Sequence, residues 1–481
     1  MKKSSLLFSC FVLGLIWIGF AFNAPRINRS SITHISDTLP YFLIKARDHK
    51  GQSVVSTNNV LRFTTGLHND FYQADSNGKT GYLYIEAKMA TLVNQTQKRV
   101  PLNLCIVIDR SGSMEGKKMT YAKQAARGII ERMQEEDIVS VVMYDNFVDS
   151  VQVPVRVTDK EAIYKQIDAI RSRGATNLWG GTEKGYEYVA RNYKPGYVNR
   201  VLLISDGRAN VGLVEPTQIR AKVQRYKDEQ GITLSTFGVG LDYNETLMTE
   251  MAETGHGNYY FIDAPDKMAA MFDKELNGLL HVAAQEAELQ IRMPAGTKAL
   301  KSYPMKYTEE GELITIKLRD LFSDETRGTV FTFSIADGTN GVLKFHSKIS
   351  YIDISDGQPR SIEHDNILKP VRNVDAYLTH FNKPVVEQVI LSKANENLEL
   401  AMAAADKGEY DQSNYYVESN RKFLKAHGGY MNTSYELRRM DTINLNYGLD
   451  LARARSLGAD SVKKVQKASK DFNYRVRQKK D

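Results

Sequence analysis

Cysteine is scarce in this sequence, with two residues in a chain of 481. Cys10 lies in an apolar segment near the N-terminus, and Cys105 lies inside a run of apolar residues that predicts a buried strand. We therefore expect no intrachain disulfide in the mature protein. A domain of this size does not need one, because burial of an apolar core can hold it together.

Several catalytic signatures are also missing. The sequence contains no G-x-x-x-x-G-K-[ST] stretch, which argues against a P-loop nucleotide site. Its nine histidines form no H-E-x-x-H pattern, and no G-x-S-x-G elbow is present. Ser111 and Ser113 have no histidine near them in the sequence to serve as a general base. These absences predict a binding protein and not an enzyme.

Charge of one sign is not strongly in excess, since 64 basic residues face 57 acidic ones and the net charge is +7. Much of the excess lies in the last stretch, Arg453–Lys480, so the main body gives little reason to expect nucleic-acid binding. The basic stretch is either a solvated helix face or frayed tail, or a surface for anionic lipid headgroups or an acidic partner.

The N-terminus has the pattern of an export signal. Lys2 and Lys3 precede an apolar run, Leu6–Phe22, and Gly19 and Ala21 are small residues suited to cleavage after Ala21. The run is also long enough to stay as an uncleaved membrane anchor. We assign residues 1–24 to this segment and expect an exported protein, periplasmic or at the cell surface.

Strands and helices alternate between about residues 101 and 280. The first strand is nearly continuous in apolar residues, as expected when helices cover both faces of a sheet. This order predicts an α/β fold with a doubly wound, mostly parallel, Rossmann-like sheet that binds ligands at the carboxyl ends of its strands. The predicted strands are Leu102–Ile108, Ile138–Met143, Val201–Ile204, Ile232–Val239 and Tyr259–Ile262. The predicted helices are 119–133, Lys160–Ile170, Thr182–Asn192, Glu215–Glu229, Glu245–Thr254 and Ala264–Leu280.

Oxygen-bearing side chains follow these strands. A D-x-S-x-S turn with Asp109, Ser111 and Ser113 comes directly after the first strand. Thr176 lies in a G-A-T-N loop, and Asp206 closes a later apolar strand before a glycine. Hydroxyl and carboxylate oxygens are hard ligands, so this set predicts a Mg²⁺ site with an open position, which Mn²⁺ also suits.

Residues 101–280 resemble a von Willebrand factor type A domain, and the five residues match the metal-ion-dependent adhesion site of that family. The resemblance implies that Ser111, Ser113 and Thr176 contact the metal through their hydroxyls, and that Asp109 and Asp206 act mainly through coordinated water. It also implies that an Asp or Glu side chain from a protein partner completes the coordination shell.

Other residues flank this predicted site. Arg110, Asn177 and Arg208 stand next to the ligands in sequence and are candidates for the rim that contacts the partner carboxylate. Asp145 and Asp149 follow the second strand, where we expect loop and cap residues or support for the site. In some relatives the last helix of the domain moves between affinity states, and here that helix is Ala264–Leu280.

The regions on either side of this domain have β patterns, and residues 372–481 have helical ones. We expect residues 25–100 and 281–371 to form one β-sandwich into which the domain is inserted, with two separate β modules as the alternative. The predicted flanking strands are Tyr41–Ala46, Val60–Thr64, Tyr82–Met89, Leu289–Met293, Leu313–Leu318, Thr329–Ile335, Val342–Phe345 and Ile349–Ile352. A G-T-N-G stretch, residues 338–341, predicts a hairpin between two of them.

The sequence thus predicts an exported adhesion or protein-binding module that captures an acidic side chain through a divalent cation. Two alternatives stay open at this point. In one, the metal is structural and the chain is an envelope scaffold whose β and helical parts make the contacts. In the other, the chain is an accessory subunit that recruits a separate enzyme.

Overall fold

The computed structural model describes residues 49–76, 79–91, 99–477 and 479. The predicted export segment, Leu6–Phe22, and the predicted strand Tyr41–Ala46 lie outside these residues. Among the residues that are described, no helix combines the length and apolar character needed to cross a bilayer.

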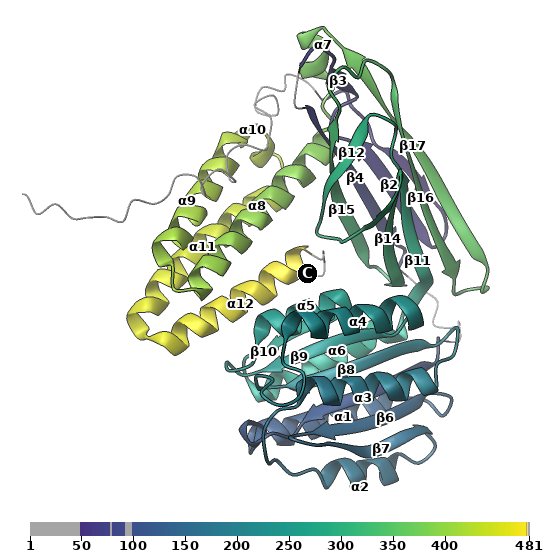
Figure 1. Ribbon diagram of the computed structural model, residues 1–481, viewed down its shortest axis with the longest axis vertical. Helices are drawn as coiled ribbons and strands as arrows, with labels where there is room; N and C mark the ends of the chain where they lie inside the picture. The colour runs from purple at the N-terminus through teal and green to yellow at the C-terminus, as the bar shows by residue number, and fades with distance from the viewer. Residues whose placement is uncertain (1–48, 77–78, 92–98, 478, 480–481) are drawn as a thin grey trace, which may run out of the picture. The chain divides into compact units, whose positions relative to one another are not determined.

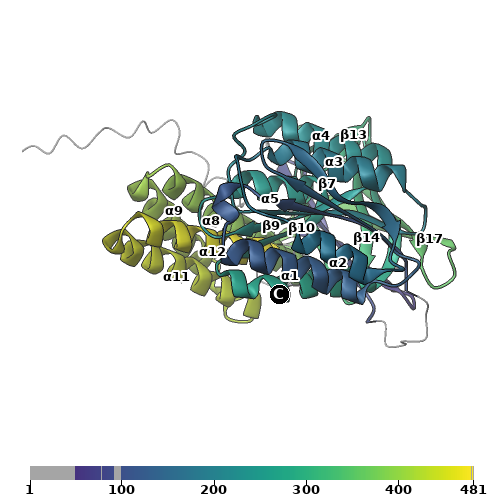
Figure 2. The same cartoon turned by 90° about the horizontal axis from the view of Figure 1, so that it is seen from below.

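The middle of the chain forms a six-stranded sheet covered by helices on both faces (Figures 1 and 2). All neighbouring strands in this sheet are parallel except the last pair, β6 and β7, which is antiparallel. The strands, in sheet order, are β10 (His256–Ile262), β9 (Thr233–Val239), β8 (Val198–Ser205), β5 (Leu102–Asp109), β6 (Ile138–Tyr144) and β7 (Val148–Arg156).

Alternate residues of β5 pack against different helices. Leu104 and Ile106 belong to the core under α1, α2 and α6, whereas Cys105 and Val107 belong to the core under α3, α4 and α5. This explains the continuous apolar run, because both faces of the strand are buried. The predicted doubly wound fold is confirmed. The helices are α1 (Lys117–Arg132), α2 (Lys160–Asp168), α3 (Leu178–Arg191), α4 (Pro216–Gln230), α5 (Glu245–Thr254) and α6 (Met268–Leu280).

Strands from both sides of this unit form two sheets that pack face to face. One sheet contains β1 (Val54–Thr57), β2 (Leu61–Leu67), β4 (Lys79–Met89), β15 (Thr326–Ile335) and β12 (Thr297–Tyr303), in that order. The other contains β13 (Thr308–Glu310), β14 (Leu313–Phe322), β11 (Val282–Arg292), β16 (Leu343–Asp353), β17 (Pro359–Val371) and β3 (Phe71–Gln73). Phe63 and Phe331 of the first sheet share a core with Ile291 and Phe345 of the second.

The pairing of β4 with β15 shows how the α/β unit is inserted. β4 precedes the unit in sequence and β15 follows it, yet they are antiparallel neighbours from Lys79↔Ile335 to Lys88↔Thr326. The two flanks therefore share a sheet, and the arrangement with two separate β modules is not the one adopted.

Two details of the predicted β region were wrong. The strands predicted at Val342–Phe345 and Ile349–Ile352 are parts of one continuous strand, β16, which begins at Leu343. The turn at residues 338–341 does not form a hairpin, because β15 lies in one sheet and β16 in the other. The turn instead carries the chain from one sheet of the sandwich to the other. The local sequence alone does not distinguish such a crossing from a hairpin.

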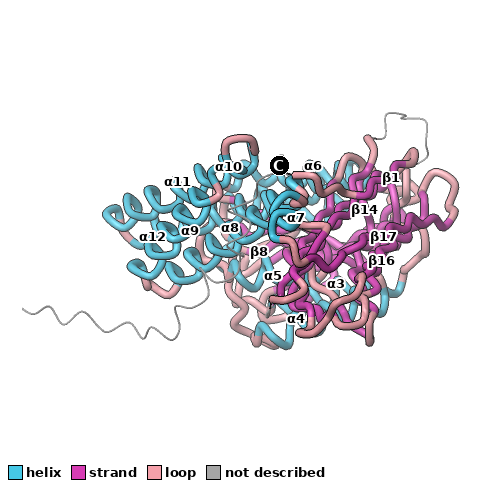
Figure 3. The backbone as a smooth tube through the Cα atoms, turned by 90° about the horizontal axis from the view of Figure 1, so that it is seen from above, coloured by secondary structure: helices cyan, strands magenta, loops and turns pink. Residues whose placement is uncertain are grey.

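The rest of the chain is helical, and its long helices group beside the strands (Figure 3). A ladder of buried amides joins three of them: Asn420 donates to the Asn444 side chain at 3.0 Å and accepts from Asn397 at 3.2 Å. The helices are α7 (Val374–Thr379), α8 (Lys383–Asp406), α9 (Tyr410–Ala426), α10 (Gly428–Met431), α11 (Tyr435–Leu457) and α12 (Ala459–Arg477).

Candidate metal centre

The predicted ligands lie where parallel strands of the α/β sheet end. β5 and β8 are direct neighbours, with Ile108 opposite Ile204, so Asp109 and Asp206 emerge beside each other. We use the term carboxyl edge for the loops that follow β5, β6, β8 and β9, together with the loop before α3 that is hydrogen-bonded to them. These are residues 109–116, 145–147, 205–212, 240–244 and 171–177.

Asp109 is fully buried at this edge. Its Oδ1 accepts the Ser111 N–H at 2.8 Å, and its Oδ2 accepts the Ser205 hydroxyl at 2.6 Å. Burial raises the pKa of the Asp109 carboxyl to about 6, and the neighbouring Asp206 carboxylate adds to this, while the hydrogen bonds oppose it. The two groups that donate to Asp109 are neutral, a hydroxyl and a backbone N–H.

The two serines connect the first loop to the second acid. Ser111 Oγ lies 3.1 Å from Ser113 Oγ, and the Ser113 hydroxyl donates to Asp206 Oδ1 at 2.7 Å. Both serines come from the turn that starts the short 3₁₀ segment Gly112–Met114. The turn therefore places both hydroxyls on the same side as the carboxylate of Asp206.

Thr176 reaches the same place from the loop before α3. That loop is held by two hydrogen bonds, from Gly112 N–H to the Gly174 carbonyl at 3.1 Å and from Thr176 N–H to Asn210 Oδ1 at 2.8 Å. A Cβ atom added to Gly207 would lie 3.0 Å from Thr176 Oγ1 and 3.6 Å from Asp109 Oδ2. The hydroxyl and the carboxylate therefore converge on the backbone of Gly207.

The five predicted ligands thus lie in one part of the carboxyl edge: Ser111, Ser113 and Asp206 are linked by contacts between their side chains, and Thr176 and Asp109 both approach Gly207. Hydroxyl and carboxylate oxygens are ligand types that suit a hard divalent cation. A positive charge is already present there, because the Lys118 ammonium pairs with Asp206 and donates to the Ser113 carbonyl, the latter at 3.2 Å. Within the described part of the chain, this site included, no three His, Cys, Asp or Glu side chains gather closely enough to hold a metal, so the candidate site depends on its hydroxyls as well as on its two carboxylates.

The three predicted rim residues have different surroundings. Arg110 is buried and its guanidinium forms ion pairs with Asp145 at 3.0 Å and Asp149, so it does not face solvent. The Asn177 side chain caps α3 by accepting the Gly180 N–H at 3.1 Å. Arg208 is exposed, and its Nε donates to the Asp242 carbonyl at 3.1 Å. Of the three, Arg208 alone offers its side chain to an incoming ligand.

Three residues beside the ligands were not singled out from the sequence. They are Lys118, which pairs with Asp206, Ser205, which donates to Asp109, and Asn210, which holds the Thr176 backbone. Ser205 was detectable in principle, because it stands at the end of β8 directly before Asp206. Lys118 and Asn210 gave no signal, since their roles depend on which loops meet in the folded chain.

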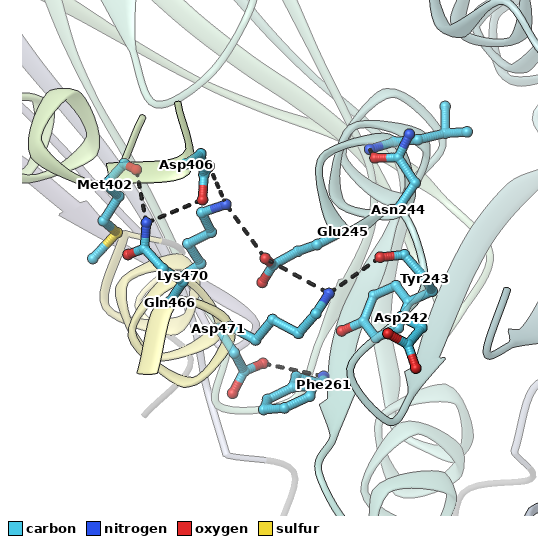
Figure 4. A network of polar contacts seen from close by, with 12 residues as sticks. Asp242, Tyr243, Asn244, Glu245, Phe261, Met402, Asp406, Gln466, Lys470 and Asp471 are labelled. Atoms are coloured by element: carbon cyan, nitrogen blue, oxygen red, sulfur yellow. Dashed lines mark hydrogen bonds and ion pairs between the residues drawn. The ribbon is translucent and has the colours of Figure 1, made fainter. Parts of the chain in front are cut away.

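The C-terminal helix α12 packs against the loop after β9 (Figure 4). Lys467 donates to the Tyr243 carbonyl at 3.2 Å, and its ammonium lies 3.6 Å from the centre of the Tyr243 ring. Lys470 pairs with Glu245 at 3.3 Å and with Asp406 of α8 at 2.5 Å. Burial lowers the pKa of Lys467 to about 8, although Glu245 opposes the shift. Part of the basic stretch thus contacts acids of the chain itself.

Comparisons with known proteins agree with the α/β fold of this unit. The model of the von Willebrand factor type A domain family matches residues 103–274. The uncharacterized protein YfbK of Escherichia coli is 32% identical over 191 residues, which cover 39% of this chain and 33% of that protein. The protein sll0103 of Synechocystis sp. is 26% identical over 263 residues, which cover 53% of this chain and 62% of that protein. The chain therefore spans less than two thirds of either relative.

A solved structure described as von Willebrand factor type A from Catenulispora acidiphila has a similar fold. It matches with a TM-score of 0.66 and 14% identity, over 89% of this chain and 99% of that one. The likeness extends beyond the α/β unit to most of the described chain. Residues 103–274 therefore form a von Willebrand factor type A domain, set between strand-rich regions and followed by C-terminal helices.

Proposed function

We propose that the type A domain binds Mg²⁺, or Mn²⁺ in its place, and uses the ion to capture an Asp or Glu side chain of a protein partner. Ser111, Ser113 and Thr176 would hold the ion through their hydroxyls, and Asp109 and Asp206 mainly through coordinated water. The observation that carries this proposal is the convergence of these five side chains from three loops on the carboxyl edge.

The chemistry of the donor set favours capture of an anion. Direct contact with three neutral hydroxyls, while the two carboxylates act mainly through water, would leave a divalent ion with affinity for one more oxygen ligand, and a carboxylate is the best match. Asp109 and Ser111 lie buried, so the first loop is held before any partner arrives. A preorganised site costs less conformational entropy on binding than a mobile loop does.

The same contacts favour binding over catalysis. The hydroxyls of Ser111 and Ser113 contact each other and Asp206, and within the described residues neither forms a hydrogen bond to a histidine. A serine nucleophile needs a base in that position. We infer that the chain is not itself an enzyme. We place it outside the cytoplasm, on the strength of the sequence pattern of Leu6–Phe22.

Thermal unfolding of the full-length chain, titrated with Mg²⁺, tests the metal site. A ligand that binds only the folded state stabilises it by about 2.7 kcal/mol at roughly a hundredfold excess over Kd, so the midpoint of the wild type should rise. The midpoint of Asp109→Ala should stay flat. Ser113→Ala serves as a second variant, because it removes one hydroxyl without emptying a buried position, and Asp242→Ala is a matched control at the same edge.

The result that would contradict the metal site is a wild-type midpoint that does not move at millimolar Mg²⁺ or Mn²⁺. A further measurement addresses the use of the ion. Partner binding that is equally strong with and without EDTA would favour the scaffold alternative, in which the sandwich and helices make the contacts.

A further inference from the structure

The carboxyl edge of the type A domain has two unlike sides. In the sheet, β9 and β10 lie on one side of the β5–β8 pair and β6 and β7 lie on the other. On the β9 side, α12 is packed against the domain: Lys463 pairs with Asp242 at 3.4 Å and Asp471 accepts the Phe261 N–H at 3.4 Å. Helix α12 of the same chain therefore occupies the β9 side of the domain.

The β6 side carries an exposed aromatic ring. Phe147, in the turn between β6 and β7, is 70% exposed, which is high for a large apolar residue. The turn is held firmly, since the Phe147 N–H donates to Asp145 Oδ1 at 2.7 Å and its carbonyl accepts the Asp145 N–H at 2.9 Å. The side chain of the preceding residue, Asn146, accepts the Ala175 N–H at 2.9 Å. The backbone of the turn is thus held beside the loop that carries Thr176.

Exposed guanidinium groups lie on the same side. The Arg173 side chain is 63% exposed, and Arg171 next to it is also exposed. Arg173 is held in place, because its backbone N–H donates to the Arg110 carbonyl at 2.7 Å and its guanidinium pairs with Asp145 at 2.8 Å. Asp145 and Asp149 together balance the charges of Arg110 and Arg173: Asp145 pairs with both arginines, and Asp149 pairs closely with Arg110 and lies 4.0 Å from Arg173. Arg171 adds a third guanidinium on this side.

We propose that the partner is an acidic protein segment that runs from the metal across the β6 side, placing an apolar side chain on Phe147 and a second carboxylate before Arg173. This inference rests on the proposed function, in which the first carboxylate of the segment binds the ion. An exposed aromatic side chain on a well-held turn, beside exposed guanidinium groups, is a typical anchor for such a segment. Charge complementarity would fix its direction on the domain.

An array of short synthetic peptides tests the proposal with the full-length protein in Mg²⁺ or EDTA. Each peptide has one central Asp, and its neighbours are varied among Gly, Leu, Phe, Glu and Lys. Retention of a peptide by the protein should require Mg²⁺. It should rise when the central Asp has an apolar neighbour and a second acidic residue, and it should fall when a neighbour is Lys. Phe147→Ser and Arg173→Ala should each weaken retention of the preferred peptides by about fivefold, the size expected of an exposed contact.

Matched controls exist elsewhere on the chain. Leu449→Ser removes a 58% exposed apolar side chain from α11, and Arg191→Ala removes an exposed guanidinium from the end of α3 away from the metal site. Neither should change retention. Mg²⁺-dependent retention that ignores the neighbours of Asp and is unchanged in Phe147→Ser and Arg173→Ala would overturn this inference while the metal function stands. If the protein retains no peptide in a Mg²⁺-dependent way, both this inference and the proposed capture of a carboxylate through the ion are contradicted.

Discussion

His68, directly after β2, is a buried residue whose protonation state is fixed by the sandwich around it. It is 3% exposed, and its Nδ1 accepts the Tyr82 N–H at 3.2 Å. Burial lowers the pKa of His68 from 6.5 to about 4. In the folded protein the ring therefore stays neutral at pH values where the unfolded chain takes up a proton.

The stability of the fold should for this reason fall in mild acid. The pKa of His68 is lower in the folded state, so its contribution is complete above pH 6.5 and is lost as the pH falls toward 4. The loss amounts to about 3 kcal/mol. In His68→Asn, which keeps an acceptor for Tyr82, the decline in unfolding free energy between these pH values should be smaller by that amount. Equal pH slopes in denaturant unfolding of both proteins would refute the assignment.

The stability of the helical region should depend on its ladder of buried amides. Asn420 of α9 joins the side chains of Asn397 and Asn444 and donates to the Ala394 carbonyl at 2.9 Å. Asn420→Leu leaves buried polar groups without partners, which should destabilise the fold by about 2–4 kcal/mol. Asn414→Leu, at an exposed position of the same helix, should change stability by less than about 0.5 kcal/mol. Chemical denaturation of both variants measures the difference.

Among the elements, α6 is the helix that the sequence marked for possible movement. Its Glu275 is buried and pairs with Arg200 of β8 at 2.7 Å. It also accepts from Ser235 at 2.6 Å and Tyr260 at 2.9 Å. Burial alone would raise the pKa of Glu275, but Arg200 and the hydrogen bonds outweigh it and lower the pKa. The helix is therefore held to the sheet by a buried charge.

Removing this charge should loosen α6 strongly. Glu275→Leu leaves the Arg200 guanidinium buried without its partner, at a cost of about 3–5 kcal/mol. Asp273→Asn is the matched control on the same helix, because its exposed pair with Arg132 should contribute less than about 1 kcal/mol. Unfolding in guanidinium chloride separates the two cases. A small decrease in the unfolding free energy of Glu275→Leu would mean that α6 has another well-packed position available.

The elements that sequence patterns predicted well are those buried on both faces. β5 reads as a nearly continuous apolar run and β8 contains the apolar run Val201–Ile204, whereas β17 buries only some of its side chains and was missed. The edge strand β7 was missed for the same reason.

The difference between strands that the sequence revealed and strands that it did not also explains which features of the site were predicted. The five ligands follow strand ends and were predictable from spacing along the chain. The burial of Arg110 was not, because its partner Asp149 lies on β7, whose position the sequence did not reveal. The exposure of Phe147 likewise depends on the turn that leads into β7.

On the scale of the whole molecule, the last helix ties separate parts of the chain together. The Tyr474 ring of α12 packs edge-on against Tyr259 of the type A domain, with 6.0 Å between ring centres. Arg477 pairs with Glu399 of α8 at 2.7 Å, and Lys479 pairs with Glu86 of the sandwich at 2.6 Å. Residues from three regions thus meet near the end of the chain.

Ending the chain after Gly458 should uncouple these regions. With α12 present, we expect calorimetric unfolding in one main transition, and without it in at least two, because few contacts would then join the helices to the type A domain. Lys463→Ala, which removes one exposed pair with Asp242, should keep the single transition. A single transition in the shortened chain as well would show that α12 is not the coupling element.

The insertion of the type A domain into the sandwich has a mechanical consequence. Both connections leave at the edge opposite the candidate metal site, since β5 begins at Leu102 and α6 ends at Leu280, directly before β11. The Gln285 side chain of β11 also contacts the Tyr197 carbonyl, just before β8 begins, at 3.4 Å. Tension between a captured partner and the sandwich would run along the central strands and load their hydrogen bonds together in shear, not one after another.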